Sequence, residues 1–89
     1  GSYKQWMEGN QPPDVVFEVL SPGNTAEEME RKRQWYERYG VQEYYLYDPD
    51  NPAFFGWHRI GNALLPLRNA VGTTSPLLGV RFDWDTQQD

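Results

Sequence analysis

Two charged residues lie among apolar neighbours in this sequence, and each could take part in metal-assisted chemistry. Glu18 is inside the segment 15–20, VVFEVL, which is the most apolar run of the chain. A carboxylate in the middle of a strand costs several kcal/mol to bury unless it is paired or bound to a metal. Glu18 is therefore either a metal ligand or catalytic carboxylate, or a residue near a sheet edge that reaches water.

Lys32 is the second charged residue in apolar surroundings. On a helical wheel with about 100° per residue it falls between Tyr36 and Tyr39, near the middle of an apolar arc. A lysine on the buried stripe of a helix is unusual, although its stem can pack while the ammonium reaches water. If Lys32 and Glu18 meet, they offer a carboxylate for a cation and an ammonium for an oxyanion or a water molecule. They could equally form a simple buried ion pair.

A strand, a helix and a second strand must position these two residues. The segment 15–20 is bounded by Pro12-Pro13 before and Ser21-Pro22-Gly23 after, which predicts a strand buried on both faces. Asn24 or Thr25 then caps a helix that runs to about Tyr39 and ends at Gly40. The segment 43–47, EYYLY, is a second strand. Such a unit places its two strands parallel.

The remainder of the chain predicts more strands and two polar ends. Segments 54–60 and 63–67 flank Gly61-Asn62, a pattern typical of a β-hairpin, and 79–84 alternates like a last strand. Residues 1–13 are a polar lead-in, and 85–89 a tail that we expect to fray. The fold class is thus α/β, within a single domain over residues 1–89: strand–helix–strand, then a hairpin and a last strand.

Composition limits the kinds of site and partner. The 89 residues include no cysteine and one histidine, His58, which excludes disulfides and sites rich in cysteine or histidine. A cation would be held by carboxylates, which favours magnesium or manganese. The net charge of −5 argues against a generic nucleic-acid-binding module. No apolar run of about twenty residues and no signal-peptide pattern occurs, so we expect no membrane span and a cytoplasmic location.

The segment PPDVVFEVLSPGNTAEEMERKRQWYERYGVQEYYLYDPD, residues 12–50, resembles the Uma-two family of bacterial endonucleases. That family is a branch of the restriction-endonuclease-like, PD-(D/E)XK superfamily. The resemblance implies a metal-dependent nuclease that hydrolyses DNA phosphodiester bonds with Mg²⁺ or Mn²⁺. It implies that Glu18 is the glutamate of the E-x-K motif and a metal ligand. Leu20 occupies the usual place of the motif lysine, and Lys32 matches a lysine that has moved to the following helix.

The resemblance covers the C-terminal half of such a domain. Asp14 follows Pro13 like the PD of the superfamily name, but it lies on the same strand as Glu18, about 13 Å away at roughly 3.3 Å per residue. The motif aspartate belongs to a preceding strand, so Asp14 is interpreted as a strand-entry residue. We therefore expect a partial restriction-endonuclease-like core, and a fragment that is inactive because the upstream aspartate is missing.

A second interpretation is a non-enzymatic module, a truncated nuclease fold that associates with itself or with a partner. The missing first motif, the acidic balance and a sheet that one helix cannot cover all favour it. A homo-oligomer is expected under either interpretation, because exposed sheet faces and edges favour association.

Overall fold

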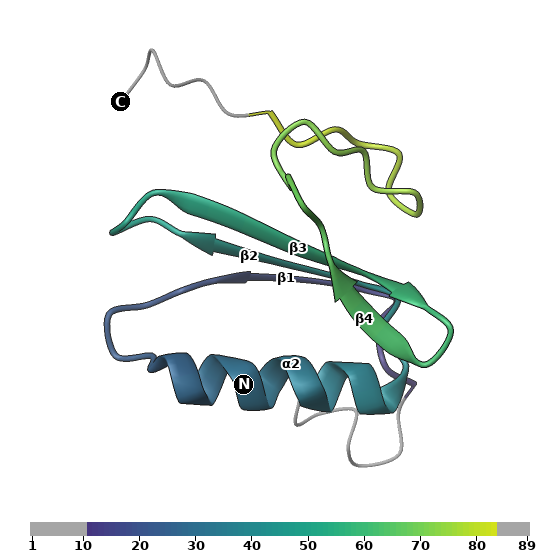
Figure 1. The fold of residues 1–89 in the computed structure, drawn as a ribbon, viewed down its shortest axis with the longest axis horizontal. Helices are drawn as coiled ribbons and strands as arrows, with labels where there is room; N and C mark the ends of the chain where they lie inside the picture. The colour runs from purple at the N-terminus through teal and green to yellow at the C-terminus, as the bar shows by residue number, and fades with distance from the viewer. Residues whose placement is uncertain (1–10, 84–89) are drawn as a thin grey trace.

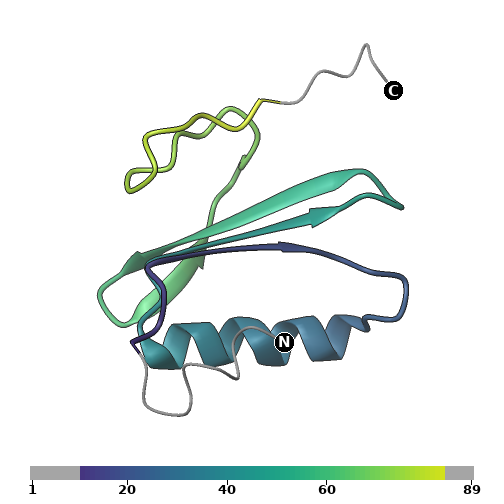
Figure 2. The ribbon, with the colours of Figure 1, turned by 180° about the vertical axis from the view of Figure 1, so that it is seen from behind.

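The computed structural model describes residues 11–83, which form a mixed four-stranded sheet with one helix against one of its faces (Figure 1, Figure 2). The regular elements of this part, in chain order, are β1 (Val15–Val19), α2 (Ala26–Tyr39), β2 (Glu43–Asp48), β3 (Ala53–Ile60) and β4 (Ala63–Pro66). The strands lie in the order β1-β2-β3-β4, with β1 and β2 parallel and the other neighbours antiparallel. The α/β class, the parallel strand–helix–strand unit and the hairpin are confirmed.

Local signals at both ends of α2 fix its length. Thr25 is the N-cap: its Oγ1 accepts from the Glu28 backbone N–H at 3.0 Å, and the Glu28 carboxylate accepts from the Thr25 N–H at 3.4 Å. Gly40 ends the helix at φ 95°, a left-handed conformation that glycine adopts without strain. The sequence allowed either Asn24 or Thr25 as the cap, and the structure selects Thr25.

None of the helical structure in residues 11–83 is long and apolar enough to cross a membrane.

The C-terminal end of α2 is tied to the β3–β4 hairpin by hydrogen bonds. The Arg59 guanidinium on β3 donates to the carbonyls of Val41 at 2.8 Å and Glu37 at 2.5 Å. The Glu37 carboxylate in turn accepts from the Leu64 backbone N–H on β4 at 2.8 Å. Carbonyls at a helix C-terminus lack partners within the helix, so a cation there both satisfies them and complements the helix dipole. The helix is thereby fixed across the sheet.

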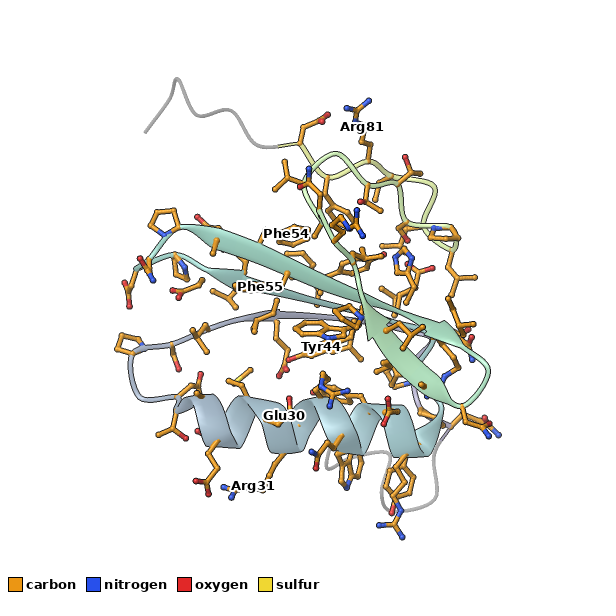
Figure 3. All side chains as sticks on the ribbon, viewed as in Figure 1. Glu30, Arg31, Tyr44, Phe54, Phe55 and Arg81 are labelled. Atoms are coloured by element: carbon orange, nitrogen blue, oxygen red, sulfur yellow. The ribbon has the colours of Figure 1, made fainter. Side chains whose placement is uncertain are left out.

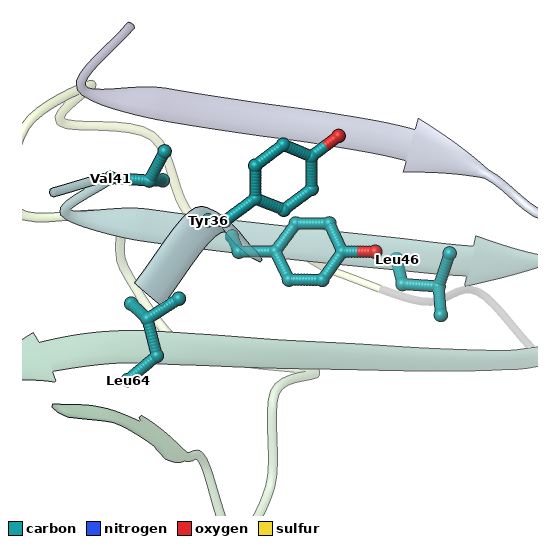
Figure 4. Close-up of a cluster of buried hydrophobic side chains, with 5 residues drawn as sticks. Tyr36, Val41, Leu46 and Leu64 are labelled. Carbon is teal, nitrogen blue, oxygen red and sulfur yellow. The ribbon is translucent and has the colours of Figure 1, made fainter. Parts of the chain in front are cut away.

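The hydrophobic core lies between α2 and the sheet. Its buried side chains come from the helix, from the turn that follows it, and from strands β2 and β4: Tyr36, Val41, Tyr44, Leu46 and Leu64 (Figure 4). The Tyr44 ring packs against Tyr36 with centroids 4.9 Å apart and stacks on Trp57 at 5.1 Å. Such aromatic packing allows a short chain to form a core, because each ring buries a large area.

The segment after β4 lies over the other face of the sheet, away from α2 (Figure 1, green to yellow). The Phe82 ring contacts Tyr45 at 4.5 Å and Phe54 at 5.0 Å. The buried Glu43 carboxylate holds the same segment, because its Oε1 accepts from the Ser75 hydroxyl and its Oε2 from the Leu77 backbone N–H at 2.9 Å. The sheet thus carries a second layer of aromatic and polar contacts opposite the helix.

Two expectations about strands need correction. The last strand expected at 79–84 does not form in the described residues 79–83, where Arg81 makes only an isolated bridge to Thr74. A turn at 75–79, closed by the Gly79 N–H to the Ser75 carbonyl, leaves too little extended chain for a strand. The expected lead-in has no regular structure in its described residues 11–13; residues 1–10 and the expected tail 85–89 lie outside the described part.

The expectation that the first strand is buried on both faces is also wrong. Phe17 is 53% exposed and Val19 59% exposed, on the face away from the helix. Within residues 11–83, β1 pairs with β2 alone and is therefore an edge strand. The segment after β4 lies over this face, and its Phe82 ring contacts Phe17 with ring centroids 6.4 Å apart. Val19 remains exposed.

Candidate functional site

The parallel register of β1 and β2 turns Glu18 toward the helix. Val16 pairs with Tyr44, and Glu18 pairs with Leu46. Tyr44 and Leu46 both belong to the core beneath α2, and paired residues on neighbouring strands project to the same side of a sheet. Glu18 therefore points into the space between the sheet and the helix. Val16 points the same way, because side chains two residues apart on a strand share a face.

Lys32 reaches Glu18 from the middle of α2. Its ammonium donates to the Glu18 Oε2 at 3.1 Å, and this contact is also an ion pair. The Lys32 side chain is 23% exposed and that of Glu18 is 20% exposed, so the pair is accessible on one side. A hollow of about 220 Å³ lies against Lys32 and is lined also by Glu28, Arg31 and Trp35. The two residues selected from the sequence thus meet, and both side chains remain partly exposed to solvent.

Tyr44 adds a third polar group to this cluster. Its hydroxyl donates to the Glu18 Oε1 at 3.0 Å, from a side chain that is 1% exposed. Figure 3 shows Tyr44 between the sheet and α2. Burial raises the pKa of Tyr44, and the negative charge of Glu18 raises it further, so the phenol keeps its proton and donates at any physiological pH. The sequence does not select this tyrosine. Its hydrogen bond to Glu18 becomes evident once the pairing of β1 with β2 is known.

The donor type at this cluster fits a hard cation, but the number of donors is small. Carboxylate oxygen is the ligand that Mg²⁺ and Mn²⁺ prefer, and Glu18 supplies one carboxylate. Residues 11–83 contain no group of three or more histidine, aspartate or glutamate side chains placed to hold a metal ion. Glu18 can therefore be one ligand among several, with the others coming from water, substrate or a carboxylate outside this part of the chain.

Three other polar residues of the sheet and its turns lie away from this cluster. Asp14 is exposed at the entry to β1, where its backbone carbonyl accepts from the N–H groups of Gln42 and Glu43. His58 lies on the opposite face of the sheet, with its Nε2 at 2.7 Å from the Tyr45 hydroxyl. The Asp48 carboxylate accepts from the backbone of the turn that follows it. The position of Asp14 agrees with the strand-entry role expected for it.

Comparison with known proteins gives one informative result. The family model Uma2, described as a putative restriction endonuclease, matches residues 1–86. Neither the curated proteins nor the solved structures include a significant match. The family match includes both Glu18 and Lys32, together with every strand and the helix described above.

Proposed function

The chain belongs to the Uma2 family, and we propose that it forms part of a nuclease that hydrolyses DNA phosphodiester bonds with the help of Mg²⁺ or Mn²⁺. The observation that carries this proposal is the meeting of Glu18 from β1 with Lys32 from α2 at 3.1 Å, in a position that solvent can reach. A purely structural ion pair that is only partly buried would gain little, because solvent still screens it. A nuclease site, in contrast, needs both groups.

Each residue has a defined role in the proposed reaction. Water attacks the phosphorus, the bond from phosphorus to the leaving oxygen breaks, and that oxygen takes up a proton. A divalent cation, when bound, would supply Lewis-acid polarisation of the phosphate. Glu18 provides a carboxylate ligand for that cation. Lys32 donates a hydrogen bond to the phosphoryl oxygen on which negative charge accumulates, or orients the attacking water.

We propose that the 89-residue chain is a partial domain and is inactive by itself. Cleavage of this kind needs converging carboxylates around the cation, and the described residues offer Glu18 without a cluster of further ligands. We expect a longer form of the protein, one that brings a second carboxylate to Glu18, to cut DNA. This longer form is called the full-length protein in the experiments below. A DNA substrate also agrees with the cytoplasmic location expected from the sequence.

Replacing Lys32 with methionine tests the proposed electrostatic role. The substitution keeps the length of the stem and removes the ammonium, so cleavage of plasmid DNA by the full-length protein should fall about 10²–10³-fold at saturating Mg²⁺. The measurement is the rate of nicking and linearisation on a gel. Arg38→Met is the matched control, because Arg38 lies on the same helix, is exposed, and is not among the residues that line the hollow beside Lys32.

The two variants separate a catalytic role from a general loss of positive charge. Both lower the net charge of the protein equally, so any loss of DNA binding by charge alone affects both. A folded Lys32→Met protein that cuts DNA as fast as Arg38→Met would refute the role proposed for Lys32. Loss of cleavage in Lys32→Met alone supports it.

A second candidate function, self-association of a non-enzymatic module, is favoured by the exposed apolar side chains of β1. Phe17 and Val19 are more than half exposed on an edge strand, where another copy of the chain could add a strand or cover the face. We expect the chain to sediment as an oligomer and Val19→Lys to shift it toward the monomer. A monomer at high concentration in sedimentation equilibrium would count against this candidate without affecting the nuclease proposal.

A further inference from the structure

We propose that Tyr44 is a positioning residue for the Glu18 carboxylate, which holds it in the orientation that binds the cation. The proposal rests on the function proposed above and extends it to a residue on β2. Tyr44 and Lys32 divide the carboxylate between them: the tyrosine hydroxyl donates to Oε1 at 3.0 Å and the lysine ammonium to Oε2 at 3.1 Å. The two donors come from the sheet and from the helix, so together they define the carboxylate plane.

The Tyr44 hydroxyl is held in place by the packing of its ring. The ring lies between Tyr36 of α2 at 4.9 Å and Trp57 of β3 at 5.1 Å, and it is nearly parallel to the indole, with an interplanar angle of 19°. The side chain is buried at the centre of the core between helix and sheet (Figure 3). A ring fixed on both sides cannot change rotamer without opening the core. The hydroxyl therefore presents its proton at a constant place.

A fixed donor matters because a free glutamate side chain is flexible. Glutamate loses rotamer entropy when it is ordered, and a cation that binds a mobile carboxylate must overcome that loss. An ionised carboxylate has about four acceptor positions, and the two donors occupy two of them. The remaining positions are left for a cation and its water. Ordering Glu18 before the cation arrives should thus strengthen metal binding.

The chain offers a closely matched control on the same strand. Tyr45 is the next residue, is also fully buried, and also donates its hydroxyl to a glutamate, Glu43, at 2.7 Å. Because side chains alternate along a strand, this second tyrosine–glutamate pair lies on the opposite face of the sheet from Glu18. Tyr45→Phe therefore removes an equivalent buried hydroxyl without touching the cluster of Glu18, Lys32 and Tyr44.

The test compares Mn²⁺ binding by the protein at its full length and by its Tyr44→Phe and Tyr45→Phe variants. Binding is followed through paramagnetic broadening of the Glu18 carboxyl carbon signal, which needs no catalysis. Loss of a hydrogen bond to a ligating carboxylate typically weakens metal binding by 10–100-fold, so we expect the Mn²⁺ dissociation constant of Tyr44→Phe to rise by about that factor. The constant for Tyr45→Phe should stay at the wild-type value, although its thermal stability falls.

Each result has a defined meaning. Weaker binding in Tyr44→Phe alone supports the positioning role. Wild-type binding in Tyr44→Phe, or equal weakening in both variants, overturns it and leaves the proposed nuclease function intact. If Mn²⁺ does not broaden the Glu18 signal even in the wild-type protein, Glu18 is not a metal ligand, and the proposed function and the role of Tyr44 are both refuted.

Discussion

Glu18→Gln is expected to lower the rate of metal-dependent DNA cleavage by the full-length protein about 10³-fold. Glutamine has nearly the same size, and its amide oxygen can still accept from the Tyr44 hydroxyl. It is neutral, however, so it holds a divalent cation poorly. A loss of about 4 kcal/mol of stabilisation from a metal ligand corresponds to a decrease of about 10³-fold in rate. The measurement is plasmid cleavage across a Mg²⁺ titration, because added metal should not restore the rate of the variant.

Glu27→Gln is the appropriate control for this substitution. Glu27 also forms an ion pair with a basic residue of α2, Arg31 at 2.8 Å, but both of these side chains are largely exposed. Such surface pairs contribute little to stability, so Glu27→Gln should fold and cut as the wild-type protein does. Thermal unfolding of Glu18→Gln should also change little, because its own ion pair is partly screened by solvent. Undiminished cleavage by a well-folded Glu18→Gln protein would contradict the proposed site.

Glu43→Ala is expected to destabilise the fold more than any of the substitutions at Glu18, Lys32 or Tyr44. Glu43 is 3% exposed, and its carboxylate accepts from the hydroxyls of Tyr45 and Ser75 and from the Leu77 backbone N–H. Alanine would leave these donors without their acceptor, at about 1–3 kcal/mol for each buried group that stays unsatisfied. A total loss of about 3–5 kcal/mol would lower the melting temperature by more than about 10 °C in a domain of this size.

Circular dichroism melting measures this loss, and the pH dependence of the melting temperature identifies its origin. Burial raises the pKa of Glu43, but the hydrogen bonds from Ser75, Tyr45 and Leu77, with the positive charge of His58, lower it more, to below the ordinary value of 4.5. The unfolded chain therefore binds a proton more readily at this position than the folded chain. The stabilisation is fully present above about pH 4.5 and is lost as pH falls through the lower, folded pKa.

The pH profile of Glu43→Gln should consequently be flatter than that of the wild-type protein at acid pH. Glu28 and Glu30 also have lowered pKa values, from hydrogen bonds with Asn24 and Arg33 respectively, but both residues and their hydrogen bonds are unchanged in the variant. The difference between the two profiles thus isolates Glu43. Parallel profiles would show that Glu43 does not contribute to stability as an ionised acceptor.

The elements of the fold could be predicted from the sequence where their signals are local. The capping residues of α2, Thr25 and Gly40, lie at its ends, and the turn pair Gly61-Asn62 lies between the two strands that it joins. Glu18 and Lys32 could be selected because each breaks an apolar pattern within its own element. Their meeting could be expected because the helix between two parallel strands must pack on the sheet.

The remaining features depend on contacts between distant parts of the chain. Glu43 and Ser75 are 32 residues apart, and neither stands out in its own segment, so the buried network opposite the helix gave no sequence signal. The expected strand at 79–84 alternates as a true strand does, but the turn at 75–79 folds it back on residues 72–74. The exposure of Phe17 follows from the edge position of β1, and strand order cannot be read from an apolar run alone.

Adjacent residues of β2 serve opposite sides of the molecule: Tyr44 bonds to Glu18 beneath the helix, and Tyr45 bonds to Glu43 beneath the C-terminal segment. Point mutations can therefore alter either side separately during evolution. Insertions and deletions cannot, because adding or removing one residue between α2 and β2 would turn each tyrosine toward the wrong side. The connection between α2 and β2 consists of three residues, Gly40, Val41 and Gln42. Its length should consequently be constant among relatives, even where its sequence diverges.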